Sequence, residues 1–65
     1  MNIEINGTPR EVHADTLAAL LCEIGQPTEA LATAVNGAFV PATARDGQRL
    51  HAGDRVELLT PNQGG

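Results

Sequence analysis

The sequence contains no lysine, tryptophan or tyrosine, and it has a single cysteine and a single phenylalanine. With Cys22 alone, the chain cannot form an intramolecular disulfide, and one reduced thiol suits a cytoplasmic protein. The two histidines, His13 and His51, have no cysteine partners at metal-ligand spacing, so we expect no metal site. The sequence also has no Walker-type phosphate loop, and we expect no stably bound cofactor. The fold must therefore be held together by packing alone.

The sequence also lacks the features of export, membrane insertion and nucleic-acid binding. Its start has no basic region followed by an apolar one, and no apolar run approaches the roughly 20 residues of a membrane span. Eight acidic residues against four arginines give a formal charge of -4. Because phosphate binding needs a basic face, we expect no nucleic-acid partner, and a basic protein surface suits this chain better.

The first half of the sequence predicts two strands and a helix. Residues 1–6 alternate apolar and polar side chains, and residues 8–13 return as a second strand after the turn signal Asn6-Gly7. We expect a helix over residues 16–24 with Asp15 as its N-cap, because four apolar side chains then form one stripe. The stripe consists of Leu17, Leu20, Leu21 and Ile24.

The second half predicts three strands. Residues 31–36 and 38–40 flank a second Asn-Gly turn, residues 42–50 suggest a turn or short helical bend, and residues 55–60 form the last strand. Core packing is the favoured interpretation of Phe39, and a partner-facing anchor is the alternative. Leu59 lies on the opposite face of its strand from Val56, which makes it a second candidate for partner contact.

This order of elements indicates an α+β fold, in which a mixed sheet of four to five strands packs on one main helix. We expect the first and last strands to be parallel neighbours in the middle of the sheet, because the connection between them is long enough for a crossover. The sequence thus predicts one domain over residues 1–60, followed by a flexible tail over residues 61–65.

The tail ends in Gly64-Gly65. Two glycines lack Cβ atoms and can enter a channel too narrow for side chains. The last group is then an unhindered carboxylate, which an enzyme can activate for attack by a sulfur or nitrogen nucleophile. A frayed terminus and a cloning scar are the simpler interpretations of the same residues.

The whole pattern resembles the ubiquitin-like β-grasp fold and, within it, the ThiS family of sulfur carriers in thiamine biosynthesis. The resemblance covers nearly the whole chain and lies in short stretches that follow one another in the expected order. These are Ile3-Glu4-Ile5-Asn6-Gly7, Asp15-Thr16-Leu17-Ala18-Ala19-Leu20-Leu21, Ala34-Val35-Asn36-Gly37, Phe39-Val40-Pro41, Gly53-Asp54-Arg55-Val56-Glu57-Leu58-Leu59 and Gly64-Gly65.

The resemblance implies a protein substrate and not an enzyme. A ThiF-like adenylyltransferase would use ATP to adenylate Gly65, and a sulfur donor protein would then convert it to a thiocarboxylate. Thiazole synthase would accept that sulfur. Gly64 would let the tail pass into a partner, where Asn62 and Gln63 would form hydrogen bonds. We expect the free carrier to be a monomer.

Two alternatives remain open at this point. The first is a sulfur carrier of another pathway, of the type found as the small subunit of molybdopterin synthase. The second is a β-grasp interaction module that binds a partner through its sheet and does not use its terminal glycines. An enzyme based on Cys22 has almost no support, because the sequence offers no base and nucleophile pair.

Overall fold

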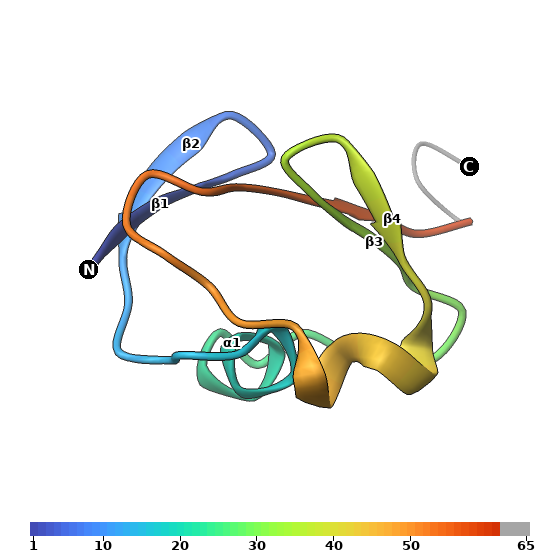
Figure 1. Cartoon of the computed structure of the whole chain (residues 1–65). Coiled ribbons are helices and arrows are strands. Elements are labelled where there is room, and N and C mark those ends of the chain that lie inside the picture. Colours follow the sequence, from blue (N-terminus) through green and yellow to red (C-terminus); the bar gives the residue numbers. More distant parts are fainter. Residues whose placement is uncertain (62–65) are drawn as a thin grey trace.

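The computed structural model describes residues 1–61 of the chain. One five-stranded mixed sheet has the strand order β2-β1-β5-β3-β4. The strands are β1 (Asn2–Ile5), β2 (Thr8–Glu11), β3 (Ala32–Val35), β4 (Ala38–Val40) and β5 (Arg55–Leu59). The helix α1 (Leu17–Glu23) and the 3₁₀ helix η1 (Ala42–Gly47) lie on one side of the sheet (Figure 1). The α+β class and the single main helix are confirmed.

Both Asn-Gly turns close antiparallel hairpins. Asn6 and Gly7 have φ values of 51° and 83°, and Asn36 and Gly37 have 51° and 85°. Two successive positive φ values define the turn that matches the twist of a two-residue hairpin, and asparagine and glycine reach them at the lowest cost. These turns fix the β1–β2 and β3–β4 registers, with Ile5 opposite Thr8 and Val35 opposite Ala38.

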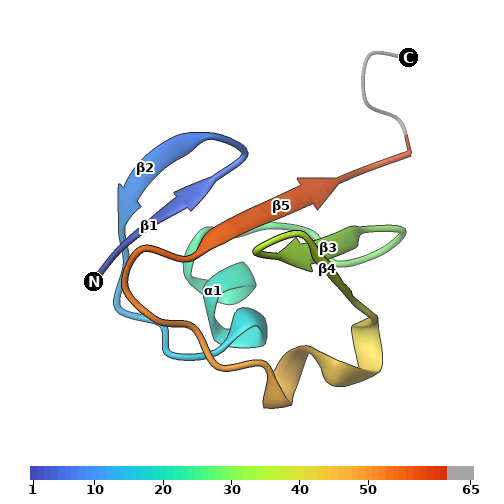
Figure 2. The same ribbon diagram turned by 45° about the horizontal axis from the view of Figure 1, so that its top comes forward.

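The first and last strands are parallel neighbours, as predicted. Glu4 is paired with Arg55 and Ile5 with Val56, and the two strands run side by side in the same direction in Figure 2. On its other side β5 pairs with β3 in the antiparallel sense. β5, which leads to the tail, is therefore flanked by strands on both sides at its start, and by β3 alone towards its end.

The helix begins one residue later than predicted. Thr16 is the N-cap, with an extended backbone, and its Oγ1 accepts a hydrogen bond from the N–H of Ala19 at 3.2 Å. Asp15 as N-cap is wrong, because its backbone carbonyl accepts the N–H of Leu50 and it lies before the first helical turn. The backbone of Thr16 also forms an isolated antiparallel β-bridge with that of Arg49. These contacts with the segment after η1 set the start of α1.

The helix ends as predicted at a glycine. Gly25 has a φ of 71°, its N–H donates to the carbonyl of Cys22, and the N–H of Gln26 donates to that of Leu21. This pair of bonds is the Schellman motif, which needs a left-handed residue at the position that Gly25 occupies.

The core lies between the sheet and α1. Leu17, Leu20 and Leu21 are buried and Ile24 is partly buried, so the predicted stripe faces inward, whereas Cys22 is exposed. The buried side chains of the main cluster come from every layer: Ile3, Val12, Ala14, Leu17, Leu20, Val35, Val40, Leu50 and Val56. Phe39 is absent from it. Within residues 1–61, no helix is long and apolar enough to cross a membrane.

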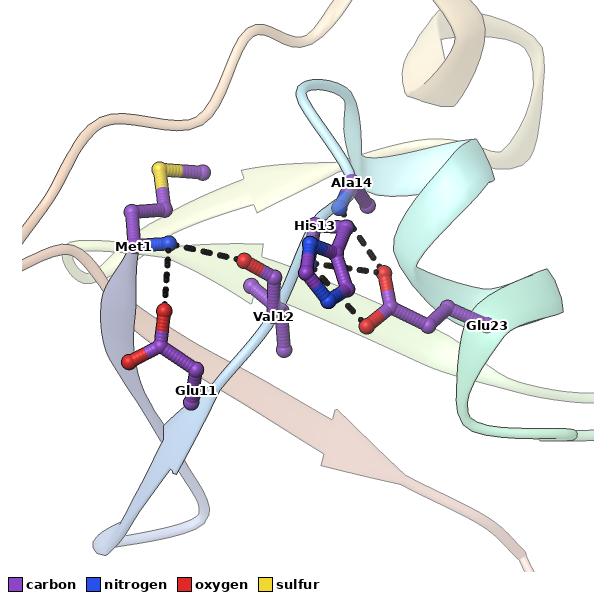
Figure 3. Close-up of polar contacts among 6 residues, drawn as sticks. All are labelled: Met1, Glu11, Val12, His13, Ala14 and Glu23. Carbon is purple, nitrogen blue, oxygen red and sulfur yellow. Dashed lines mark hydrogen bonds and ion pairs between the residues drawn. The ribbon is translucent and has the colours of Figure 1, made fainter.

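Polar contacts of two charged groups, the amino group of Met1 and the carboxylate of Glu23, fasten the segment that joins β2 to α1 (Figure 3). The amino group of Met1 is 3.1 Å from Oε2 of Glu11 and donates to the carbonyl of Val12 at 2.8 Å. The Glu23 carboxylate accepts the backbone N–H groups of His13 at 3.1 Å and of Ala14 at 2.8 Å. The hydrogen bond from His13 is the largest of the effects that hold the pKa of Glu23 below its ordinary value.

η1 occupies the first part of the region predicted as a turn or short bend, and it buries Arg45. Arg45 as a whole is only 6% exposed. Its Nε donates to Thr33 Oγ1 at 3.2 Å and its Nη2 donates to the carbonyl of Leu31. Thr33 Oγ1 in turn donates to the carbonyl of Val40 at 2.7 Å. This chain of hydrogen bonds joins η1 to β3 and β4 beneath the sheet.

Candidate functional site

The face of the sheet opposite α1 carries an apolar patch at the end of β5. Along β5 the side chains alternate, so that Val56 points into the core while Glu57 and Leu59 point outward. Directly paired residues of neighbouring strands share a face. The register therefore places Ala32 beside Leu59, and Ala34 beside both Glu57 and Phe39, on the outer face.

The two large side chains of this patch stand on either side of small ones. Phe39 is 70% exposed and Leu59 is 63% exposed, and they are the two exposed large hydrophobic residues among residues 1–61. Because the alanine side chains between Phe39 and Leu59 are short, a shallow groove remains between these two large residues. We call it the outer groove; its lining includes Asn6, Ala32, Ala34, Phe39, Glu57 and Leu59.

The favoured interpretation of Phe39 as a core residue is wrong. β4 is a three-residue strand at the edge of the sheet, and its alternation turns Val40 inward, where it is 4% exposed. Phe39 must then point to the outer face. The apolar letters of residues 38–40 do not show which of them faces the core, because a run without alternation has no readable period.

The outer groove carries acidic charge. Among residues 1–61, Glu57 is the only charged residue of its lining. Glu4 and its neighbour Arg55 follow on the same outer face, towards the centre of the sheet. A partner that fits the groove therefore needs an apolar group between Phe39 and Leu59 and a basic group near Glu57.

Two asparagine side chains hold β5, one at each end. Oδ1 of Asn36 accepts the N–H of Arg55 at 2.9 Å, and its Nδ2 donates to Oδ1 of Asp54 at 3.0 Å. Oδ1 of Asn6 accepts the N–H of Leu58 at 2.8 Å, and its Nδ2 donates to the carbonyl of the same residue at 3.1 Å. We call these contacts the two asparagine clamps. Sequence reasoning used both asparagines as turn residues only and missed this second role.

The clamp at the start of β5 also affects a carboxyl group. Asp54 accepts Nδ2 of Asn36 and the backbone N–H of His51, the latter at 2.7 Å. The hydrogen bond from Asn36 comes first among the causes that hold the pKa of Asp54 below its ordinary value, and the one from His51 comes second. The carboxylate form of Asp54 is thus part of the folded turn.

The predicted tail residues Asn62, Gln63, Gly64 and Gly65 lie outside the described residues, so their roles stay predictions. Leu59 lines the outer groove, and the described chain continues from it through Thr60 to Pro61. Within residues 1–61, no three His, Cys, Asp or Glu side chains come together as a metal site. The outer groove and the exit of β5 beside it are therefore the candidate functional site.

Comparison with known proteins identifies a matching family model and similar solved structures. The sequence model of the ThiS family matches residues 3–65. A crystal structure of the thiamine biosynthesis protein ThiS from Geobacter metallireducens superposes with a TM-score of 0.85 at 30% identity, and the match covers 100% of both chains. A solution structure of a thiamine biosynthesis protein from the same organism gives a TM-score of 0.75 at 28% identity, over 91% of this chain and 81% of the other. These neighbours confirm the predicted β-grasp arrangement. No curated protein sequence matched the chain.

Proposed function

The chain belongs to the ThiS family, and from this we propose that it is a sulfur carrier of thiamine biosynthesis that carries sulfur on Gly65. Membership of the family and the two solved neighbours support the carrier role and the pathway. The observation that carries the proposal is the family match through Gly64-Gly65 on a chain whose last strand ends beside an exposed apolar groove.

The proposed chemistry uses the carboxylate of Gly65 as a substrate. A ThiF-like adenylyltransferase joins this carboxylate to the AMP portion of ATP and releases pyrophosphate. The outer sulfur of a persulfide on the donor protein attacks the acyl carbon, and AMP leaves. The product is an acyl disulfide that still contains the S–S bond of the persulfide. A thiol then attacks the donor-side sulfur of that bond, so that the thiol and the donor cysteine form a disulfide and the thiocarboxylate of Gly65 is released for thiazole synthase. In this scheme the chain supplies no acid, base or metal, and its role is to present the acyl group.

The outer groove gives the adenylyltransferase a docking surface next to the tail. Phe39 and Leu59 would contact an apolar side chain of that enzyme, and Glu57 would meet a basic one. The net charge of -4 favours approach to such a basic surface. Since Leu59 is the last residue of β5, a partner seated here holds the chain within two residues of Pro61.

The intact mass of the protein tests the proposal. The chain with its native C-terminus is incubated with ATP, the adenylyltransferase and a persulfide donor. We expect a mass gain equal to the exchange of one oxygen for sulfur, located on Gly65 by fragmentation. A chain extended by one residue beyond Gly65 should keep its fold and gain no mass, whereas Asp15→Ala, an exposed change far from the tail, should react like the original protein.

Two results would decide against parts of this scheme. Normal sulfur loading of the extended chain would refute Gly65 as the acceptor. If loading succeeds, the thiocarboxylated protein is offered separately to thiazole synthase and to the large subunit of molybdopterin synthase. We expect transfer to the first, and exclusive transfer to the second would move the chain to the alternative pathway.

A further inference from the structure

Near its end, β5 forms hydrogen bonds with a side chain, at a point where β1 has no backbone group to pair with it. The N–H of Asn6 donates to the carbonyl of Val56 at 2.9 Å. Asn6 then enters the turn that leads back to β2. Along a strand, the backbone N–H and C=O groups of successive residues point alternately to one neighbouring strand and to the other. After Val56, the next residue of β5 whose groups point to the β1 side is therefore Leu58. No backbone of β1 lies opposite it, since β1 has already ended.

The amide of Asn6 fills this place. Its oxygen accepts the N–H of Leu58 and its nitrogen donates to the carbonyl of Leu58, at 2.8 and 3.1 Å. An asparagine amide carries the same donor and acceptor as a peptide group. The side chain therefore continues the ladder between β1 and β5 by one step, up to the residue before Leu59.

We propose that Asn6 is a positioning residue for sulfur loading, in that its clamp sets the direction in which the chain leaves the sheet. The inference rests on the proposed function. Six residues, 60–65, separate β5 from the acyl carbon, and their maximum span is about 20 Å. A shift of Leu58 moves the point from which these residues start, and a misplacement of about 1 Å at a reacting group can cost on the order of 100-fold in rate.

The same side chain links the tail to the docking surface. Asn6 lines the outer groove together with Leu59, so a partner seated there contacts the residue that holds the exit of the tail. Without the clamp, Leu58 and Leu59 keep only their pairing with β3, through Thr33 and Ala32. The partner would then have to fix the direction of the exit itself, which lowers the rate of loading at a given carrier concentration.

The chain contains its own matched control. Asn36 occupies the same place in the second Asn-Gly turn, with the same φ of 51°, and its amide also makes two hydrogen bonds to the segment of β5. Those bonds lie at the start of the strand, on Asp54 and Arg55. Glycine adopts positive φ freely, so Asn6→Gly and Asn36→Gly preserve both turns and each remove one clamp.

The experiment compares the original protein with these two variants. Melting temperature reports stability, and initial rates of thiocarboxylate formation with the adenylyltransferase, ATP and a persulfide donor give kcat and KM. We expect similar small losses of stability in both variants. Only Asn6→Gly should lower kcat/KM, by about tenfold, because only that clamp lies at the exit of the tail.

Equal kcat/KM values for the two variants would overturn the inference. Loading of the original protein is the internal check: if it gains no sulfur, the proposed function itself has failed. Amide hydrogen exchange of the original protein provides a test that needs no variant. The N–H of Leu58 should exchange about as slowly as that of Val56, and rapid exchange at Leu58 would show that the clamp is absent in solution and would also overturn the inference.

Discussion

Phe39 and its neighbour Val40 show how two adjacent apolar residues can have opposite environments. Burying an aromatic side chain contributes more to a small core than any other residue type, yet the one aromatic group of this chain is 70% exposed. This exposure is the basis for the proposal that Phe39 contacts a partner. The neighbouring Val40 is 4% exposed, so two adjacent residues have opposite environments.

The variants Phe39→Thr and Val40→Ala exploit this contrast. Threonine suits a strand, so Phe39→Thr should leave the melting temperature nearly unchanged and weaken binding to the adenylyltransferase by about tenfold. Val40→Ala should cost about 2 kcal/mol of stability and leave binding by the folded fraction unchanged. Thermal unfolding and titration calorimetry measure both effects. A large loss of stability in Phe39→Thr with normal binding would return Phe39 to a structural role.

At the scale of elements, the boundaries of α1 are set by contacts distant in sequence as well as by local ones. The C-terminal end is local, because a glycine followed two residues later by a proline stops a helix. The N-terminal end has two adjacent residues that are both good caps, Asp15 and Thr16. The segment after η1 decides which of the two is the N-cap, because it contacts the backbone of Asp15 and of Thr16.

Alanine substitutions distinguish the two caps. Thr16→Ala removes the acceptor for the N–H of Ala19 and should cost about 1 kcal/mol of stability. Asp15→Ala should cost much less, since the ion pair of its side chain with Arg49, at 3.9 Å, is exposed and contributes little. The measurement is the free energy of unfolding in urea. A larger loss in Asp15→Ala than in Thr16→Ala would contradict the assignment of the cap.

The elements also show which parts of the fold the sequence could predict. Alternation, the Asn-Gly turns and the leucine stripe predicted the five strands and the helix found in residues 1–61, with ends that differ by at most two residues. The parallel pairing of β1 and β5 followed from the order of elements. The burial of Arg45 could not be predicted, because its acceptors on Leu31 and Thr33 are distant in sequence. The clamp of Asn6 joins residues 52 positions apart, and nothing local indicates it.

For the molecule as a whole, carboxylates that accept backbone hydrogen bonds make stability depend on pH. Folding lowers the pKa of Glu23 from 4.5 and that of Asp54 from 3.8. A carboxyl group with a lowered pKa in the folded state binds protons more tightly when unfolded. Its contribution to stability is therefore present above the unfolded value and is lost as the pH falls through the folded one.

Replacement of Glu23 tests this dependence. The free energy of unfolding should fall as the pH drops below 4.5, and the fall should be less steep in Glu23→Gln, because that residue no longer titrates. Glu29→Gln makes the same charge change on an exposed loop residue and serves as the control. Urea unfolding between neutral pH and about pH 3 gives the comparison. Identical slopes for the original protein and Glu23→Gln would exclude the carboxylate as a source of acid sensitivity.

The parallel pairing of β1 and β5 determines how the molecule bears mechanical load. β1 begins at one end of the sheet, and β5 finishes at the other, in the same direction and side by side (Figure 2). A force that pulls residue 1 and residue 61 apart therefore acts along the two strands and strains their hydrogen bonds together. It cannot open them one after another, as it would in a hairpin pulled from its open end. A partner that draws on the tail thus pulls against the strongest direction of this sheet, and forced rupture is governed by the barrier to unfolding.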